Sequence, residues 1–348
     1  MKSIVIQQPN ALAIEERPLP QPGNGEVRVK VKLAGICGSD SHIYRGHNPF
    51  AKYPRVIGHE FFGVIDAVGE GVTDKVVGQG VTDKVVGQRV TVDPVISCGH
   101  CYPCSVGKPN VCASLVVLGV HRDGGFSEYA VVPAKNAWPV PENVSDHHAV
   151  MVEPFTIAAN VTGQAKPREQ DIALVYGAGP MGLTTIQVLK RVYNVRQVIV
   201  ADQIPERLQM AQQNGADWTI NNKEQPLAQA LEAQGIRPTL IIDAACHPAI
   251  FPEAIALASP AGRIVLMGFS TEPSMVAQQG ITGKELTIYS SRLNANKFPL
   301  VLEWLANGLI NPDRLITHQF AFEDVVDAMT LFEEDRKHCC KVLLTFNA

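Results

Sequence analysis

The sequence lacks long apolar runs and has no concentration of charge of one sign. Its 348 residues are 18% charged, with a net charge of -4 at pH 7 that is spread without blocks. No stretch approaches the roughly 18 apolar residues needed to span a bilayer, and the N-terminus has no apolar core of signal length. A basic stripe for contact with nucleic acid is also missing. We therefore expect a soluble, cytoplasmic protein that binds neither nucleic acid nor membranes.

Cysteine, in contrast, is plentiful and unevenly distributed. Cys98, Cys101, Cys104 and Cys112 are spaced C-x2-C-x2-C-x7-C in a loop sequence with glycine and proline. The cytosol keeps thiols reduced, so metal ligation is the first explanation for such a cluster. Four thiolates this close suit a closed, tetrahedral structural zinc site. An iron–sulfur cluster is the alternative, but the bacterial ferredoxin motif ends in a shorter spacing followed by proline, where this chain has Ala113.

The pattern of apolar residues changes at Glu153, and the length suits about two domains. Before Glu153, short alternating runs between proline and glycine turns predict a β-rich part, with strands at 3–6, 27–33, 62–68, 89–92 and 126–132. From there to about residue 290, strands alternating with helical stretches predict βαβ units, with strands at 172–176, 197–201, 218–220, 240–243, 263–267 and 286–290. The remaining residues predict helices at 298–307 and 323–334 and a final strand at 341–346 that return to the first part.

One nonapeptide, GVTDKVVGQ, occurs twice in a row, at 71–79 and 80–88. A period repeated only twice is too short for a solenoid. A local duplication that lengthens a surface hairpin or loop explains it better, because such insertions are well tolerated. We assign it no function.

A second group of metal-binding residue types lies within residues 35–60. It contains a thiol, a hydroxyl, an imidazole and a Gly-His-Glu turn, namely Cys37, Ser39, His42, Gly58, His59 and Glu60. Catalytic zinc takes three protein ligands and keeps one position open, which Cys37, His59 and a carboxylate would satisfy. The alternating strand at 27–33 would hold Cys37 rigidly. The alternative is that Cys37 is a small core residue and that the turn is an ordinary one.

A dinucleotide fingerprint lies between a predicted strand at 172–176 and a helical stretch at 183–191. Its G-x-G-x-x-G loop consists of Gly177, Ala178, Gly179, Pro180, Met181 and Gly182. The glycines permit a tight turn and a close approach of a pyrophosphate to the helix N-terminus. Asp202 ends the next strand, where an acid accepts from the ribose hydroxyls and repels a 2′-phosphate, so we expect NAD rather than NADP. Asp202 could instead only start a turn, and Arg207 nearby could tolerate a phosphate.

These three groups of residues, in this order, resemble the zinc-dependent medium-chain alcohol dehydrogenases over essentially the whole chain. The motif Cys37-Gly-Ser39-Asp-Ser-His42, the Gly-His-Glu turn and Glu153-Pro154 suggest the sorbitol, threonine and hexonate dehydrogenase branch. The resemblance implies an α/β protein with a GroES-like β-rich catalytic domain at 1–152 and 291–348, including a structural zinc lobe at about 94–119. A Rossmann NAD-binding domain at 153–290 would interrupt it, with the active site in the cleft between them. Family members are usually homodimers or homotetramers, often pairing through the last Rossmann strand.

The resemblance also implies roles for individual residues. Cys37 and His59 would be ligands of the catalytic zinc, and the third ligand would be a carboxylate. Glu153 stands where other family members have a second cysteine, whereas Glu60 in relatives either ligates directly or waits behind the metal. Binding both would make the centre net negative and a poorer Lewis acid, so we expect one direct ligand at a time. Ser39 would take the substrate proton and His42 would pass it to water, unless they are a turn hydroxyl and a surface histidine.

The predicted reaction transfers hydride between NAD and a secondary alcohol of a polyol or sugar acid, such as the hexonates L-gulonate and L-galactonate, with two zinc ions per chain. Arg292 or Lys297 could hold a substrate carboxylate. One alternative is a non-catalytic sensor that binds NAD or a metabolite and acts through a partner. A pure binder, however, has no use for an open zinc position. The other alternative is a metal-free quinone-type reductase of the same fold, which would generally lack the zinc cysteines.

Overall fold

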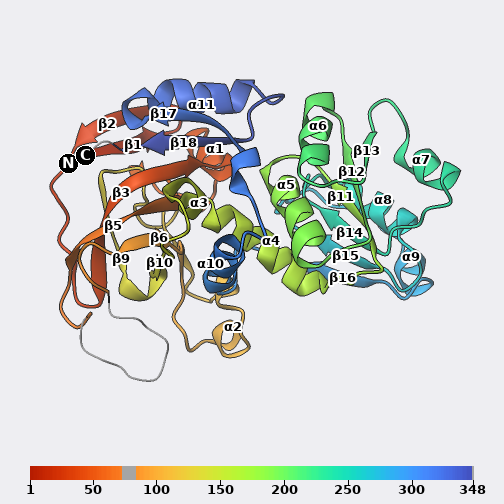
Figure 1. The fold of residues 1–348 in the computed structure, drawn as a ribbon, viewed down its shortest axis with the longest axis horizontal. Coiled ribbons are helices and arrows are strands. Elements are labelled where there is room, and N and C mark those ends of the chain that lie inside the picture. Colours follow the sequence, from red (N-terminus) through yellow and green to blue (C-terminus); the bar gives the residue numbers. More distant parts are fainter. Residues whose placement is uncertain (73–83, 347–348) are drawn as a thin grey trace. The chain divides into compact units, whose positions relative to one another are not determined.

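The computed structural model describes residues 1–72 and 84–346, drawn in Figure 1. The chain forms two compact units. Unit 1 comprises Met1–Glu153, Phe298–Ala306 and Ile316–Ala348, and unit 2 comprises Pro154–Lys297 and Asn307–Leu315. Residues 73–83, which hold most of the duplicated nonapeptide and its expected surface loop, lie outside the described residues.

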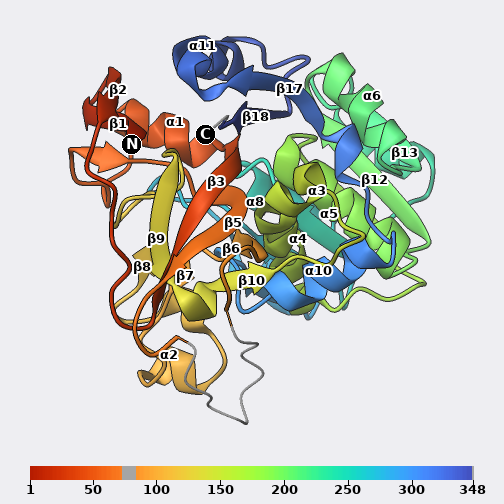
Figure 2. The ribbon, with the colours of Figure 1, turned by 60° about the vertical axis from the view of Figure 1, so that its left-hand side comes forward.

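In the described part of unit 1, the main sheet has seven strands. Six follow the order β10-β6-β5-β3-β18-β17, and β9 also pairs with β3. Their bounds are β3 Glu26–Ile36, β5 Glu60–Val68, β6 Arg89–Val92, β9 Tyr129–Pro133, β10 Ala137–Pro139, β17 Ile316–Ala321 and β18 Lys341–Thr345. The central strand is β3, which pairs antiparallel with β5, β9 and β18 (Figure 2). Its alternating Val27, Val29 and Val31 are completely buried, as expected for a strand with one face in the core.

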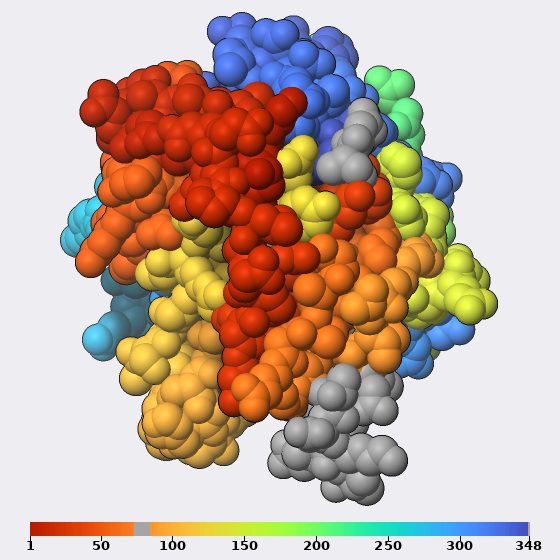
Figure 3. All heavy atoms as spheres, turned by 90° about the vertical axis from the view of Figure 1, so that its left-hand side faces the viewer, coloured from red at the N-terminus to blue at the C-terminus, as the bar shows by residue number. Residues whose placement is uncertain are grey.

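Among the described residues, two small sheets and five α-helices complete unit 1. In the small sheets, β1 (Lys2–Gln8) pairs with β2 (Ala11–Glu16) and β4 (Arg55–Val56), and β7 (Val95–Ile96) pairs with β8 (Val116–Val117). The α-helices are α1 Gly38–Tyr44, α2 Tyr102–Ser105, α3 Asp146–Val150, α10 Phe298–Ala306 and α11 Val325–Glu334. Short 3-10 turns occupy 109–111, 134–136 and 322–324. The N-terminal residues spread over the surface of this unit (Figure 3).

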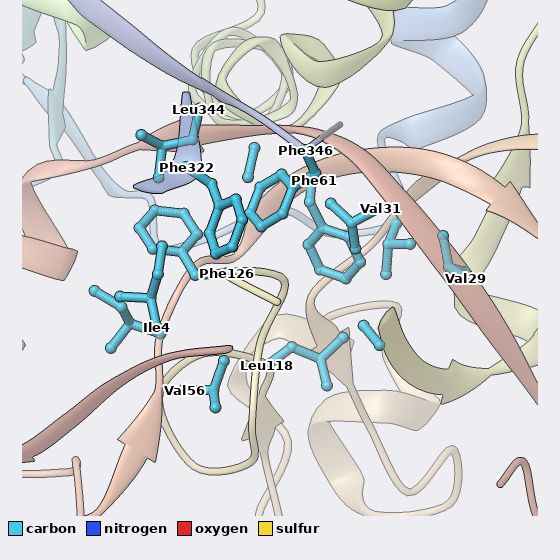
Figure 4. Packing of buried hydrophobic residues seen from close by; sticks show 14 of the residues in the cluster. Ile4, Val29, Val31, Val56, Phe61, Leu118, Phe126, Phe322, Leu344 and Phe346 are labelled. Atoms are coloured by element: carbon cyan, nitrogen blue, oxygen red, sulfur yellow. The ribbon is translucent and has the colours of Figure 1, made fainter. Parts of the chain in front are cut away.

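The core of unit 1 is built from both ends of the chain. Phe61 and Phe126 are at most 1% exposed, and the rings of Phe322 and Phe346 stack with centroids 5.0 Å apart. Figure 4 shows the cluster that these rings form together with Ile4, Val56, Leu118 and Leu344. Each large apolar side chain buried in this way contributes about 1.5–3 kcal/mol. The C-terminal segment is therefore an integral part of this core.

Unit 2 contains one parallel sheet of six strands in the order β13-β12-β11-β14-β15-β16. Their bounds are β11 Ile172–Tyr176, β12 Gln197–Asp202, β13 Trp218–Asn221, β14 Leu240–Asp243, β15 Arg263–Leu266 and β16 Thr287–Ser290. The helices are α5 Pro180–Gln187, α6 Pro205–Gln213, α7 Leu227–Ala233, α8 Ile250–Leu257 and α9 Gln278–Thr282, with a π-helical turn at 188–192 and a 3-10 turn at 312–314. Helix α4 (Val152–Ala165) begins in unit 1 and continues in unit 2. This strand order is that of a Rossmann fold, so the predicted fold class is confirmed.

Most predicted elements are present, and the differences are local. The strands predicted at 172–176 and 240–243 have the observed bounds, and the C-terminal pair of helices and final strand are confirmed to within two residues. The strand predicted at 126–132 begins only at Tyr129, because the Phe126 N–H instead donates to the Ile57 carbonyl at 3.0 Å. Strands β2, β4, β7, β8, β10 and β17 were not predicted. Among the described residues, no helix has the length and apolarity to cross a membrane.

Candidate metal centre and dinucleotide loop

Three side chains of metal-binding type converge where β3 ends and β5 begins. Cys37 directly follows β3, and Glu60 opens β5 opposite Gly35 in the antiparallel register. The Cys37 Sγ, a ring nitrogen of His59 and a carboxylate oxygen of Glu60 all lie within 4.8 Å of one another. A thiolate, an imidazole and a carboxylate are a donor set that zinc takes in proteins. These side chains therefore fit a zinc ion with three protein ligands.

Asp40 holds two of these ligands in place. Its side chain is completely buried, and Oδ2 accepts the Cys37 N–H at 2.9 Å while Oδ1 accepts the Gly58 N–H at 3.2 Å. Oδ1 also lies 3.5 Å from Nδ1 of His59, which has no hydrogen-bond partner among the described residues. A carboxylate behind Nδ1 orients the ring and leaves Nε2 for a metal, as in carboxylate–histidine–zinc arrangements.

Burial and two anionic neighbours act on His59 in opposite directions. Burial lowers the pKa of the imidazole, but the charges of Asp40 and Cys37 outweigh burial and hold the pKa well above its ordinary value. A divalent cation bound here would balance the same negative charges.

Glu60 is tied to the last strand of the chain. Its carboxylate is 1% exposed, and the Lys341 Nζ donates to both of its oxygens, at 2.7 and 2.6 Å. Gly35 provides the space for this pair, because a Cβ at that position would overlap Oε2 of Glu60. Burial lowers the pKa of Lys341, yet the charges of Glu60 and Cys37 outweigh it and raise the pKa above its ordinary value.

Glu153 lies close to this centre without belonging to the convergent cluster. It is 4% exposed in the first turn of α4, and burial raises the pKa of its carboxyl to about 8. The charges of His59, Glu60, Lys341 and Asp93 also act on this pKa, so Glu153 is within electrostatic range of all of them. Within the described residues, the group of ligand atoms less than 4.8 Å apart includes Glu60 and not Glu153. Which glutamate binds the metal directly stays a prediction.

Helix α1 carries the two predicted proton-transfer residues. The Ser39 Oγ lies 3.4 Å from Nε2 of His59, next to the metal-binding cluster. His42 follows one turn later and is exposed, with its ring 6.3 Å from that of His47. Residues three apart share a helix face, so His42 lies on the face of α1 that carries Ser39.

The four clustered cysteines also converge. Their sulfurs lie within 4.8 Å of one another, with Cys101 Sγ at 3.5 Å from Cys104 Sγ and 3.7 Å from Cys112 Sγ. Backbone N–H groups point at the sulfurs: Cys98 N donates to Cys112 at 3.3 Å, and Cys101 N donates to Cys98 at 3.4 Å. Backbone N–H groups of His100 and Cys101 lower the pKa of Cys98 to about 5, which favours the thiolate that zinc binds. All eight cysteines are free, so the cluster fits a closed tetrathiolate zinc site.

The glycine loop of unit 2 has the geometry expected of a pyrophosphate site. Gly177 follows β11 with a φ of +88°, and Gly179 is the N-cap of α5 with Pro180 in its first turn. At Gly182 a Cβ would overlap the Gly177 carbonyl oxygen, so only glycine allows the helix to start this close to the strand. Met181 lies in the first turn of α5. The helix N-terminus and its free N–H groups can accept an anion here.

Asp202 ends β12 beside this loop and is held by two backbone groups. Its Oδ2 accepts the Ala178 N–H at 2.7 Å, and its Oδ1 accepts the Ile204 N–H at 2.9 Å. Both the predicted ribose role and the alternative turn role are compatible with this position, since each carboxylate oxygen keeps a second lone pair. The Arg207 Nη1 lies 3.8 Å from where a Cβ of Gly179 would be, which places the guanidinium beside the glycine loop.

Comparison with known proteins assigns the family. Residues 23–142 match the alcohol dehydrogenase GroES-like domain, and residues 180–307 match the zinc-binding dehydrogenase domain. The chain is 72% identical over 347 residues to the starvation-sensing protein RspB of Escherichia coli strain K12, covering 100% of both chains. The chain belongs to the zinc-binding medium-chain dehydrogenases.

Two further comparisons describe the relatives of this zinc-binding dehydrogenase. A crystal structure of RspB from E. coli CFT073, complexed with NADH, has a TM-score of 0.94 and 70% identity and covers 99% of each chain. The L-galactonate-5-dehydrogenase of E. coli strain K12 is 32% identical over 349 residues, or 99% of each chain. The family predicted from the sequence is thereby confirmed.

The two predicted substrate-binding residues of this dehydrogenase lie in unit 2. The Arg292 guanidinium lies 4.7 Å from the centre of the Phe269 ring, and the Lys297 Nζ lies 3.4 Å from where a Cβ of Gly163 would be. The zinc-ligand cluster belongs to unit 1. A role of either residue in holding a substrate carboxylate therefore stays a prediction.

Sequence reasoning missed Asp40 and Lys341 at the metal centre. Asp40 could have been found from the capping-box pattern, in which an acid stands three residues after the N-cap of a helix. In the structure Cys37 is the N-cap of α1, and Asp40 completes the capping box. The sequence signal for Lys341 is weaker. It is a lysine at the start of an apolar strand, and such a lysine is ordinarily exposed and not part of a site. Only the pairing of β18 with β3 shows where it lies.

Proposed function

We propose that this protein is a zinc-dependent, NAD-dependent dehydrogenase that oxidises a secondary alcohol of a polyol or sugar acid. The observation that carries the proposal is the convergence of Cys37, His59 and Glu60 with Asp40 behind the imidazole. The L-galactonate-5-dehydrogenase relative favours a sugar acid, so L-galactonate and L-gulonate are the first substrates to test.

In this proposal the residues of unit 1 bind the zinc ion and remove the proton of the substrate hydroxyl. Cys37, His59 and one of Glu60 and Glu153 would hold the zinc ion, which when bound supplies a Lewis acid that lowers the pKa of a substrate hydroxyl. Ser39 Oγ, beside the cluster, can accept the hydroxyl proton and donate its own onward. His42, exposed on the same helix face, can release that proton to water.

The residues of unit 2 bind the cofactor in this proposal. NAD, when bound, supplies the nicotinamide that accepts the hydride. The N–H groups at the start of α5 would hold the pyrophosphate, with Gly177, Gly179 and Gly182 allowing it to approach. Asp202 would accept from a ribose hydroxyl with the lone pairs that Ala178 and Ile204 leave. The NADH complex of the relative with 70% identity supports this assignment.

The test is NADH formation by zinc-replete protein with a panel of hexonates, polyols and amino alcohols. Cys37→Ser removes a proposed ligand, and Cys246→Ser, at an exposed cysteine of unit 2, is its matched control. We expect turnover with at least one sugar acid, lost in Cys37→Ser and kept in Cys246→Ser. Turnover that survives Cys37→Ser would refute the zinc mechanism.

A non-catalytic sensor is the second candidate, because the relative at 72% identity is named a starvation-sensing protein. Such a protein would bind NAD or a metabolite and act through a partner. Zinc retained and NADH bound, with no turnover on any substrate of the panel, would favour this candidate over the enzyme.

We also propose a homodimer or homotetramer that pairs through β16. This strand is at the edge of the described sheet of unit 2 and pairs there only with β15, so its other edge can accept a second copy. Light scattering of the purified protein distinguishes these states from a monomer, which would contradict the proposal.

A further inference from the structure

Lys341 is a buried cation directly behind the metal-binding cluster. Its side chain is 1% exposed, and its Nζ donates to Oε1 and Oε2 of Glu60 and, at 3.2 Å, to the carbonyl of Ile36. An ammonium has three N–H groups, so all of them are used. A buried ammonium is unfavourable unless it is paired, and here its partner is itself a candidate zinc ligand.

The strand pairing of unit 1 fixes this position. On one side of β3, Glu60 of β5 lies opposite Gly35. On the other side, Val342 of β18 lies opposite Ile36, the residue before Cys37. The lysine, the glutamate and the zinc cysteine are thus held by three adjacent strands and cannot move apart without breaking the sheet.

We propose that Lys341 is a positioning residue of the metal centre, which offsets the charge of Glu60 and restrains its carboxylate so that the centre stays electrophilic. The proposal rests on the proposed function. Cys37 and Glu60 bring two formal negative charges and the buried Asp40 behind His59 brings a third, whereas Lys341 brings one positive charge. Three anions would exceed the charge of a divalent cation, and the lysine removes this excess. The centre is then not net negative, which favours a strong Lewis acid.

Removing the cation has a defined consequence for Glu60. In Lys341→Met both oxygens of Glu60 lose their donor, and the metal is the nearest remaining positive charge. Glu60 would then bind the metal more tightly as an uncompensated anion and make it a weaker Lewis acid. The variant should therefore have a higher metal affinity and a lower kcat. A merely structural ion pair predicts no gain in metal affinity.

The experiment is a double-mutant cycle read by metal affinity. Wild type, Lys341→Met, Glu60→Gln and the double variant are loaded with Co²⁺, and the affinity of the catalytic site is measured by chelator competition. The cysteine cluster at 98–112 is the internal reference in each sample, and Lys30→Met on β3 is the matched control. We expect Co²⁺ affinity to rise roughly tenfold in Lys341→Met and to fall roughly tenfold in Glu60→Gln. The double variant should stay near Glu60→Gln, because the lysine acts through the carboxylate that this substitution removes. The visible absorption of Co²⁺ should change only where Glu60 has lost its lysine.

The outcomes separate this proposal from the proposed function, because Co²⁺ affinity needs no substrate. If a substrate is found, kcat should fall at least roughly tenfold in Lys341→Met and recover in Lys341→Arg, which keeps the charge. Unchanged or lower Co²⁺ affinity in Lys341→Met would overturn the proposal. Should Lys341→Met fail to fold, Glu60→Gln and the double variant decide. Equal affinities in these two would support an effect through Glu60, and a higher affinity in the double variant would overturn it, because the lysine would then act on the metal directly.

Discussion

Replacing Asp40 tests whether the metal centre depends on one carboxylate that binds no metal. The side chain is completely buried and accepts two backbone N–H groups, from Cys37 and Gly58, on different oxygens. It also faces Nδ1 of His59. Asp40→Ala leaves both backbone donors without a partner inside the protein. Asp40→Asn keeps the shape but turns one acceptor into an NH₂ group, which must face a backbone N–H.

The size of the effect follows from these contacts. A buried donor left unsatisfied costs about 1–3 kcal/mol, so Asp40→Ala should lower the free energy of unfolding by roughly 2–6 kcal/mol and Asp40→Asn by roughly half of that. Because the carboxylate also orients His59, both variants should lose about 10–100-fold in zinc affinity at the catalytic site. The zinc affinity of the cysteine cluster at 98–112 should not change.

Urea unfolding of the metal-free protein, followed by tryptophan fluorescence, measures the first effect, and chelator competition measures the second. Asp327→Asn is the matched control, because Asp327 is an exposed aspartate on α11 in the same unit. An Asp40→Asn protein with unchanged zinc affinity would refute the assigned role of Asp40 behind His59. A loss of stability no larger than that of the control would refute the reasoning from its two backbone hydrogen bonds.

Three further predictions concern other parts of the molecule. Cys112→Ser should release one of two zinc equivalents and lower the melting temperature, measured by metal analysis and calorimetry, because a structural zinc site contributes its binding energy to folding; Cys246→Ser should do neither. Asp202→Ala should weaken NADH binding about 10–100-fold and reduce the preference over NADPH, measured by NADH fluorescence, because a charged hydrogen bond and a repulsive charge are lost. Glu333→Gln should lower the melting temperature near neutral pH, because the hydrogen bond from Arg45 lowers the pKa of Glu333 below its ordinary 4.5. This stabilisation is present above pH 4.5 and is lost as the pH falls below it, so the melting temperatures of wild type and variant should converge in acid.

The fold was predictable wherever a strand is identified by its own apolar sequence and not only by the strand with which it pairs. The buried parallel strands of unit 2 read as continuous apolar runs, and the bounds of β11 and β14 were predicted without error. The two-residue strands β4, β7 and β8 could not be found, because so short a strand is defined by its partner and not by its own side chains. Strand β17 has a polar sequence, ITHQFA, and its parallel pairing with β18 fixes it as a strand.

The candidate site was predictable where its residues are close in the sequence. Cys98 to Cys112 form a motif that needs no knowledge of the fold, and Cys37, His59 and Glu60 lie in one short stretch. Lys341, in contrast, is 281 residues away from its partner Glu60. Local patterns identify ligands, because ligand spacing is constrained by the metal. They do not identify the countercharge, since a cationic side chain at any position on a neighbouring strand can supply it.

A buried ionic site must nevertheless contain such a countercharge, and the fold limits where it can be. A carboxylate as deeply buried as Glu60 is unfavourable without a paired cation, so one must lie on an element in contact with it. Glu60 lies opposite Gly35 at the end of β3, and β18 lies on the other side of that end. Strand β18 begins with its only lysine, opposite the end of β3 that precedes Cys37. Strand β18 is therefore part of the candidate metal centre as well as of the core, and shortening the chain before Lys341 should weaken both together.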